Sequence, residues 1–176
     1  MNHKNLNKRC DEALTELASG NTNALTVIYE NMGRRIFFVC LSVLGDKESS
    51  EDAMQDTLLR LATEAKHYSS GTNALAFILT VARNISLNIL EKRKRDTKLM
   101  QTLEADTKTV FDNTCELTVG TLEALNILDE RDRQIVTMRL DGKMKHRDIA
   151  AVLNISVAAC QKCYRRALEK LKIFYS

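Results

Sequence analysis

Apolar residues recur every three or four positions through the first 95 residues, the spacing that gathers side chains on one face of an α-helix. The 176 residues include no proline and only six glycines, so little in the composition interrupts such helices. We therefore expect an all-α fold. The length suffices for one ordinary domain or two small ones.

Four helices are predicted in this half of the chain, over residues 2–18, 24–44, from near Ser49 to 65, and 74–95. The Ser49-x-x-Asp52 spacing predicts that Ser49 caps the third helix. The predicted buried stripes comprise Leu6, Cys10, Leu14, Leu17 and Ala18, then Leu25, Ile28, Tyr29, Met32, Ile36, Cys40, Val43 and Leu44, then Met54, Leu58, Leu61, Ala62 and Ala65, and finally Ile78, Val81, Ala82, Ile85 and Ile89.

Two small helical domains joined by a flexible linker are expected. Residues 1–95 form the four-helix unit, and residues 96–120, with six threonines and a net charge of −3, form the linker. Residues 121–176 form the second unit, with short helices at 122–128 and 129–140. No apolar run approaches the roughly 20 residues that a membrane span requires, so we expect a cytoplasmic protein.

The last part of the chain predicts a helix-turn-helix. An apolar segment at 149–153 is followed by Asn154-Ile155-Ser156 as a tight turn, with Ser156 as the N-cap of a helix of about 16 residues. Residues 131–172 carry eleven Lys and Arg against four Asp and Glu, a local charge of +7 in a chain of +3. This concentration of positive charge favours nucleic acid as the partner over a merely solvated face.

Helical rotation divides the second helix into two faces. The predicted core face holds Cys160, Tyr164, Ala167, Leu168 and Leu171, and the opposite face holds Ala158, Ala159, Lys162, Arg165, Arg166 and Glu169. Cys163 falls at the edge of the core face. The basic face can approach phosphates and base edges in a major groove.

Cys160 and Cys163 also have the C-x-x-C spacing of a metal or redox site. A structural zinc needs about four ligands, and His146, Cys115, Cys10 and Cys40 would have to complete the set without a recognisable second spacing. The three histidines have no paired nucleophile. We therefore expect no enzyme, cofactor or metal, although a thiol- or metal-responsive sensor remains an alternative.

The chain resembles bacterial sigma factors of the extracytoplasmic-function type. "EDAMQDTLLRL" (51–61) is similar to the family's A-E-D-x-x-Q-x-x-F segment, and "AFILTVARNISLNIL" (76–90) to its W-L-x-x-I-A-R-N-x-x-x-D-x-x-R segment. The stretch 128–171 is similar to the family's C-terminal pattern along its length. The resemblance implies a factor that binds core RNA polymerase, recognises a bipartite promoter and opens the DNA.

Particular residues take roles from this resemblance. The polymerase-binding set is Glu51, Asp52, Gln55 and Asp56, whose alternative is a plain solvated acidic face. The loop 66–73 would capture a base flipped from the downstream promoter element through His67, Tyr68, Ser69 and Asn73. Tyr68 can instead be a core residue, because its family counterpart is a buried Phe.

The remaining DNA-binding residues lie on the two reading helices. For the downstream element they are Arg83, Asn84, Asn88, Lys92, Arg93, Lys94 and Arg95. For the helix-turn-helix they are Lys145, Arg147, Ser156, Ala158, Ala159, Lys162, Arg165 and Arg166. The chain departs from the pattern at Phe77, where Trp is usual, and at Cys163, where Arg is usual.

An anti-sigma factor is a further implied partner. Phe38 and Leu41 fall off the stripe of the second helix and predict a second packing face or such a docking surface. A linker of about 25 residues reaches roughly 80 Å, more than the roughly 50 Å between DNA sites one and a half turns apart. A helix-turn-helix regulator without initiation activity remains the other alternative function.

Overall fold

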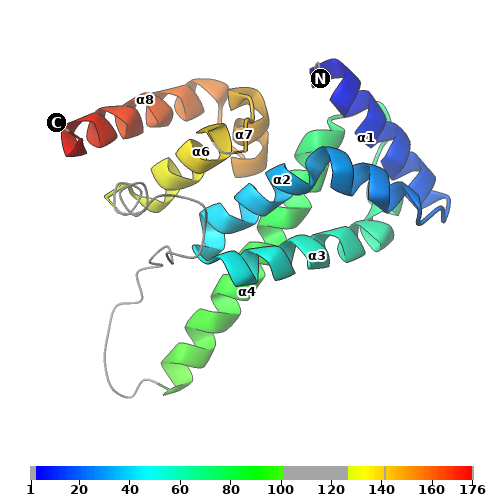
Figure 1. The fold of residues 1–176 in the computed structure, drawn as a ribbon, viewed down its shortest axis with the longest axis horizontal. Coiled ribbons are helices and arrows are strands. Elements are labelled where there is room, and N and C mark those ends of the chain that lie inside the picture. The colour runs from blue at the N-terminus through cyan, green and yellow to red at the C-terminus, as the bar shows by residue number, and fades with distance from the viewer. Residues whose placement is uncertain (1–2, 101–126, 141, 176) are drawn as a thin grey trace.

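The computed structural model describes residues 3–100, 127–140 and 142–175. Every regular element in these ranges is helical, which confirms the predicted fold class (Figure 1). The elements are α1 (His3–Ala18), α2 (Ala24–Leu44), α3 (Lys47–Glu64), the 3-10 turn η1 (Ala65–His67), α4 (Ala74–Met100), α6 (Glu130–Leu140), α7 (His146–Leu153) and α8 (Val157–Phe174).

Helix α2 is the centre of the molecule, because it packs against α1, α3, α4 and α6. Its predicted stripe is buried at Ile28, Met32 and Ile36, whereas Tyr29 is exposed. Of the two residues predicted to form a second packing face, Leu41 is buried and Phe38 is half-buried, so this face is covered in part. A docking surface for a partner at Leu41 is therefore closed here.

Helix α3 begins earlier than the sequence predicted. Asp46, not Ser49, is its N-cap, and the Asp46 carboxylate accepts a hydrogen bond from the Ser49 N–H at 2.8 Å. Gly45 ends α2 in the left-handed conformation at φ 81°. This glycine turns the chain so sharply that the following aspartate reaches the first turn of α3.

The buried stripe of α3 also differs from the prediction. Its inward residues are Ser50, Ala53, Thr57 and Leu61, while Met54 and Leu58 lie half-buried beside them and Ala62 is exposed. The Thr57 hydroxyl donates to the Ala53 carbonyl at 2.6 Å, which satisfies its buried oxygen within the helix. Small, internally bonded residues can therefore occupy core positions that an apolar pattern assigns to larger ones.

The second unit is built around α6, which contacts α2, α7 and α8. The predicted Asp129-x-x-Asp132 start is confirmed, because the Asp132 N–H donates to the Asp129 carboxylate at 2.8 Å. On α8, Cys160 and Ala167 are buried as predicted, whereas Leu168 is 39% exposed. The prediction for Leu168 was wrong because α6 and α7 cover a narrower strip of α8 than its apolar pattern spans.

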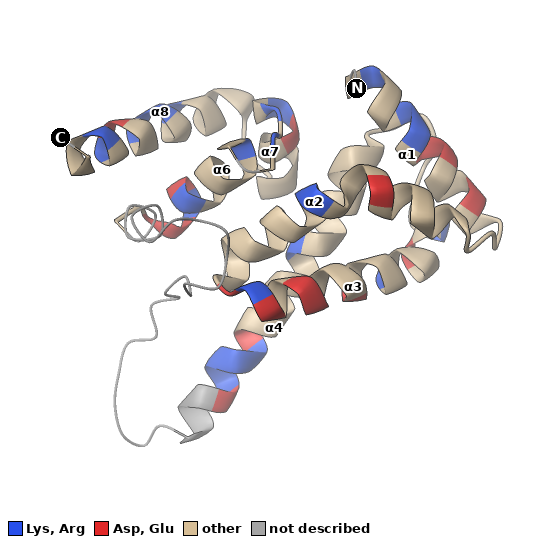
Figure 2. Cartoon of the chain, in the orientation of Figure 1, with Lys and Arg blue, Asp and Glu red and all other residues tan. Residues whose placement is uncertain are grey.

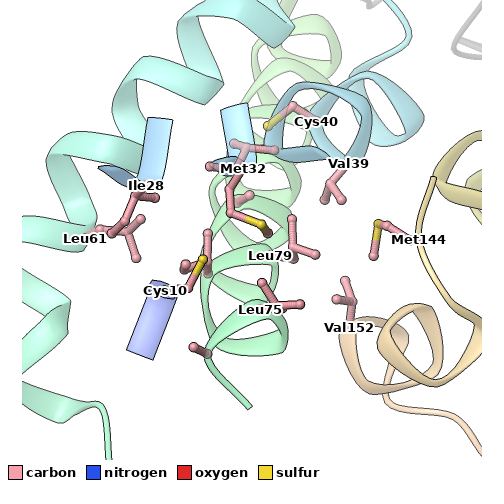
Figure 3. Packing of buried hydrophobic residues seen from close by; sticks show 14 of the residues in the cluster. Cys10, Ile28, Met32, Val39, Cys40, Leu61, Leu75, Leu79, Met144 and Val152 are labelled. Carbon is pink, nitrogen blue, oxygen red and sulfur yellow. The ribbon is translucent and has the colours of Figure 1, made fainter. Parts of the chain in front are cut away.

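The two units share one hydrophobic core. In Figure 3, Val39 and Leu79 of the first unit lie opposite Met144 and Val152 of the second, and all four residues belong to one buried cluster. The contacts run between α2 and α6 and between α4 and α7. The helical units therefore pack directly against each other in this arrangement.

Only some of the predicted segment boundaries can be compared with the structure. Helix α4 continues to Met100, past the predicted boundary at residue 95. Most of the predicted linker 96–120 and most of the predicted helix 122–128 lie outside the described residues, and the described Ile127 and Leu128 are not helical.

One helical stretch, Ala74–Asp96, is long and apolar enough to cross a membrane, contrary to the expectation from sequence. It belongs to α4, which packs against α1, α2, α3 and α7. Leu75, Ile78 and Leu79 are buried in that packing. The apolar character of this helix is thus explained by its place in the protein core.

Candidate functional site

The polar face of α3 is open to solvent. The four side chains predicted to bind polymerase are all exposed, namely Glu51, Asp52, Gln55 and Asp56. Among them Glu51 is in an ion pair along the helix, with Lys47 at 3.9 Å. Figure 2 shows acidic positions on this helix.

Leu59 lies on the same face and was not singled out from the sequence. It is 68% exposed, which is unusual for a leucine on a helix that packs against three others, α1, α2 and α4. Position 59 follows Gln55 by four residues and Asp56 by three, so the three side chains are neighbours on the helix surface. Its spacing from these residues was the available signal, but the sequence analysis placed Leu59 on neither face of the helix.

The loop between η1 and α4 divides into fixed and open residues. Tyr68 is half-buried, its ring lies 5.1 Å from the Phe77 ring, and its hydroxyl donates to the Asp11 carboxylate at 2.5 Å. Burial and this hydrogen bond raise the pKa of Tyr68 to about 12. Of the two interpretations of Tyr68, the structure thus favours the packed residue over a freely presented ring.

The other predicted loop residues, His67, Ser69 and Asn73, are exposed. The Asn73 side chain accepts a hydrogen bond from the Ala76 N–H at 3.1 Å and so also serves the start of α4. A hollow beside the loop is lined by Lys4, Asn7, Lys8, Thr72, Asn73 and Arg147, among others. The loop therefore opens onto a mainly basic depression.

The predicted reading residues of α4 occupy different environments. Asn84 and Asn88 are exposed and line a second hollow together with Arg60 and Glu64 of α3. Arg83 is half-buried, and its Nε is buried without a hydrogen-bond partner among the described residues. The two asparagines are thus more accessible to a ligand than Arg83.

The end of α4 is strongly basic. Lys92, Arg93, Lys94 and Arg95 are all exposed, and Figure 2 shows this cluster near the far end of the helix. Arg93 donates to the Asp46 carboxylate at 3.0 Å, which ties it back to the start of α3. This ion pair leaves Arg93 less available for a phosphate than its neighbours.

The helix-turn-helix prediction is confirmed in its local geometry. Asn154 ends α7 in the left-handed conformation at φ 52°, and the Ser156 hydroxyl accepts a hydrogen bond from the Ala159 N–H at 3.1 Å. The predicted DNA-binding side chains of this unit are exposed or, for Ala159, half-buried; they are Lys145, Arg147, Ser156, Ala158, Ala159, Lys162, Arg165 and Arg166.

Arg166 is already bound within the protein. Its guanidinium donates to the buried Asp132 carboxylate at 2.6 and 2.9 Å and to Asp129 at 3.3 Å. The hydrogen bond to Asp132 and the charges of both carboxylates raise the pKa of Arg166. The guanidinium therefore stays charged and paired with Asp132 of α6. Burial opposes ionisation of Asp129, but its bond from the Asp132 N–H and the charges of Lys170 and Arg166 lower its pKa. Arg166 therefore holds α8 to α6.

Arg147 is likewise engaged. His3 Nε2 lies 2.7 Å from the buried Asp148 carboxylate, and an Arg147 terminal nitrogen lies 2.5 Å from His3 Nδ1. The start of α1 thus contacts the start of α7. The sequence offered no sign of this contact, because 144 positions separate the two residues.

The cysteine pair lies mostly inside the second unit. Cys160 is buried, and burial raises the pKa of its thiol to about 11, with a further contribution from Cys163. Its sulfur lies 3.8 Å from His146 Nδ1, and burial together with Arg139 lowers the pKa of His146. Cys10 and Cys40 are buried in the core of the first unit with thiol pKa values of about 11. These neutral thiols are poorly suited to bind a metal or to attack an oxidant.

Two family models match the chain in sequence order. Sigma-70 region 2 matches residues 28–96, and sigma-70 region 4 matches residues 120–171. The first matched segment contains the polar face of α3 and the residues of α4 that the sequence analysis predicted to read DNA, and the second contains the helix-turn-helix. Together they cover most of the chain.

Two curated relatives align along most of their length. The ECF RNA polymerase sigma factor SigM of Bacillus subtilis is 22% identical over 156 residues, which are 85% of this chain and 93% of the relative. The ECF RNA polymerase sigma factor EcfG of Rhodopseudomonas palustris is 27% identical over 139 residues, which are 78% of this chain and 76% of the relative.

Solved structures agree on the fold. CnrH, in complex with the cytosolic domain of CnrY, superposes with a TM-score of 0.70 at 19% identity and covers 95% of this chain and 97% of its own. The sigma factor RpoE of Bartonella quintana, in complex with the anti-sigma factor NepR, gives a TM-score of 0.64 at 20% identity and covers 80% and 89%. With sigma-70 regions 2 and 4 both present and both curated relatives of the same type, the chain belongs to the extracytoplasmic-function type of RNA polymerase sigma factor.

Proposed function

We propose that this sigma factor binds core RNA polymerase through α3, recognises a bipartite promoter through α4 and α8, and promotes melting of the DNA. The observation that carries the proposal is the separation of two exposed charged surfaces. An acidic face lies on α3 of the first unit, and a basic face lies on α8 of the second. One chain can therefore contact protein and DNA at once.

On α3 the proposed polymerase contact consists of Glu51, Asp52, Gln55 and Asp56, and we add Leu59. An exposed leucine next to acidic residues supplies apolar area to a polar contact, a combination found in many protein interfaces. The charges steer the encounter with a basic partner surface.

On α4 the proposed downstream contacts are Asn84, Asn88 and the basic end at 92–95. The loop that precedes α4 adds His67, Ser69 and Asn73. The factor is not an enzyme in this scheme. Extruding a base costs a few kcal/mol of lost stacking, which contacts to the flipped base and the single strand must offset. Melting is thus driven by binding free energy.

On α8 the proposed upstream contacts are led by Lys162 and Arg165, with Ala158 and Ala159 allowing close approach to the groove. Arg166 contributes by holding the helix on α6. Each phosphate neutralised by this face adds a salt-dependent increment to affinity.

Bipartite recognition requires the two units to separate. In the described arrangement Leu79 and Val152 belong to one buried cluster, whereas two promoter elements one and a half turns apart lie roughly 50 Å from each other. We expect polymerase to compensate for the lost apolar contact by binding both units. Energy transfer between dyes at Thr63 of α3 and Ile173 of α8 should therefore fall when polymerase is added.

An anti-sigma factor is the proposed inhibitor, because RpoE of Bartonella quintana was solved with one. We place the whole cycle in the cytoplasm, where polymerase and promoter DNA meet. Leu41 is buried here, so an inhibitor that used it would have to bind a form of the chain in which Leu41 is exposed.

The decisive experiment combines polymerase binding and strand opening. The purified chain is expected to co-purify with core polymerase and to make promoter thymines reactive to permanganate. Binding to polymerase-free promoter DNA without any opening in the presence of polymerase would instead favour a helix-turn-helix regulator. Loss of DNA binding in Cys163→Ser, or zinc in the anaerobically purified protein, would favour a sensor.

A further inference from the structure

The loop between η1 and α4 is held from outside by one carboxylate of α1. Asp11 accepts hydrogen bonds from the Tyr68 hydroxyl at 2.5 Å, the Gly71 N–H at 2.7 Å and the Ser70 hydroxyl at 3.0 Å. These three donors lie in the middle of the loop. A single side chain thus fixes the course of four consecutive residues.

Asn7 extends this clamp to the end of the loop. Its side-chain amide donates to the Thr72 carbonyl at 3.2 Å, and its oxygen accepts from the Leu75 N–H at 3.3 Å. Asn7 precedes Asp11 by four residues, so both side chains leave α1 on the same face. Five hydrogen bonds therefore join this face of α1 to residues 68–75.

The clamp also supports an uncommon backbone conformation. Gly71 has φ +82°, a left-handed conformation that glycine adopts at little cost. A loop without the Asp11 contact would not be held in this conformation. The hydrogen bond from Tyr68 lowers the pKa of Asp11, against a raising effect of burial, and the bonds from Gly71 and Ser70 lower it further. The carboxylate is consequently charged at neutral pH, the state in which it accepts all three bonds.

We infer that Asp11, supported by Asn7, is a positioning residue for promoter melting, which holds the loop 66–73 in the shape that receives an extruded base. The inference rests on the proposed function. A loop that is ordered before DNA arrives does not lose its conformational freedom at the moment of capture, so more of the binding free energy remains for melting. His67, Ser69 and Asn73 stay exposed beside the clamped residues, where a base can reach them.

The chain offers a matched control for this inference. Glu12 is the next residue of α1, is exposed, and makes an ion pair with Lys8 at 3.7 Å instead of a contact with the loop. Asp11→Ala and Glu12→Ala each remove one negative charge from the same helix turn. Their effects on general attraction to DNA are therefore alike, and the loop contact is the difference between them.

The experiment measures open complexes formed by the full chain with core polymerase. The templates are the intact promoter and promoters in which each base of the downstream element is made abasic in turn. On the intact promoter Asp11→Ala should reduce the open fraction roughly tenfold, as expected for lost charge-assisted hydrogen bonds, and Glu12→Ala should behave as wild type. On the template lacking the captured base, Asp11→Ala and wild type should be equal.

Tyr68→Phe provides a second variant that keeps the ring against Phe77 and removes one donor. It should show a smaller loss with the same dependence on the base. An equal loss on intact and abasic templates would mean that Asp11 acts only on general stability, and would overturn the inference. If wild type itself is indifferent to every abasic position, base capture fails, and the positioning role fails with it. If wild type responds and Asp11→Ala matches Glu12→Ala, only the positioning role is wrong.

Discussion

The outer faces of α3 and α8 look alike in sequence and differ in the folded protein. Each is a run of charged residues opposite an apolar stripe. On α3, Asp52, Gln55 and Asp56 are exposed, as is Leu59, which follows them on the same face. On α8, Arg166 is held by the buried Asp132, while Arg165 beside it is exposed.

The difference shows what helical periodicity can and cannot assign. It places a residue on the outer face of a helix, but it does not say whether a neighbouring element reaches that residue. Arg166 lies at the margin of the face that α6 covers, and a long guanidinium side chain reaches across such a margin. A charged residue on an outer face is thus free for a partner only where no neighbour supplies its counter-charge.

The largest expected effect tests the α3 face. Asp52→Lys combined with Gln55→Lys should weaken binding to core polymerase by about 100-fold or more, because like charges at an interface cost several kcal/mol. Both residues are exposed, so the Tm should not change. Fluorescence anisotropy of the labelled chain titrated with polymerase measures the affinity.

The matched control is Glu12→Lys with Thr15→Lys on α1, which alters the same charges at the same spacing on another exposed surface. Its polymerase affinity should remain within about twofold of wild type. An equal loss in the control would show that net charge, not the α3 face, governs the binding.

The next effect tests the anchored side of α8. Asp132→Asn should lower the free energy of unfolding by about 1–3 kcal/mol, since the fully buried carboxylate would lose its charged bonds to Arg166 and Lys170. Urea unfolding followed by circular dichroism measures it. Glu169→Gln, on the exposed face of α8, should leave the unfolding midpoint unchanged. An unchanged midpoint in Asp132→Asn would show that the ion pairs of Asp132 contribute nothing to stability.

A third prediction separates Arg165 from Arg166. Arg165→Ala should weaken binding to promoter DNA and reduce the slope of log affinity against log salt by about 1, with no change in stability. Arg166→Ala should lower the Tm, because it removes the anchor to Asp132. If the two variants showed the same DNA affinity and the same Tm, Arg165 would not be a DNA contact distinct from the structural anchor Arg166.

The smallest effect concerns Leu59. Leu59→Ala should weaken polymerase binding about fivefold and leave the Tm unchanged, because its side chain is already in solvent. The buried Leu61 on the same helix provides the contrast, since Leu61→Ala should cost about 2–5 kcal/mol of stability. A destabilised Leu59→Ala protein would mean that this leucine packs within the chain.

Much of the local structure was predictable because it depends on neighbours in the chain. The ends of α1 and α7, the Ser156 cap and the exposed acidic face of α3 follow from spacing and side-chain chemistry within a few residues. The cap of α3 was misassigned to Ser49 because Asp46 lies within one turn of it, and the glycine turn before Asp46 makes Asp46 the cap.

The sequence predicted which residues of the candidate site lie on the surface, but not which of them are bound by other residues of the chain. The residues expected to bind polymerase are indeed exposed together, and those of the helix-turn-helix largely so. Tyr68 and Arg166 differ because Asp11 and Asp132, which are 57 and 34 positions away, bind them. No residue near Tyr68 or Arg166 in the sequence predicts these partners.

The sequence by itself determined most of the described helices, much of their inner and outer faces, the helix-turn-helix and the family, because each depends on local propensity, periodicity or motif spacing. Only the tertiary structure decided that the two units share a core, that α1 clamps the loop 66–73, and which outer-face charges are neutralised within the chain. The physical reason is the short range of the interactions involved. Hydrogen bonds and ion pairs act over a few ångströms, and only folding brings residues distant in sequence within that distance.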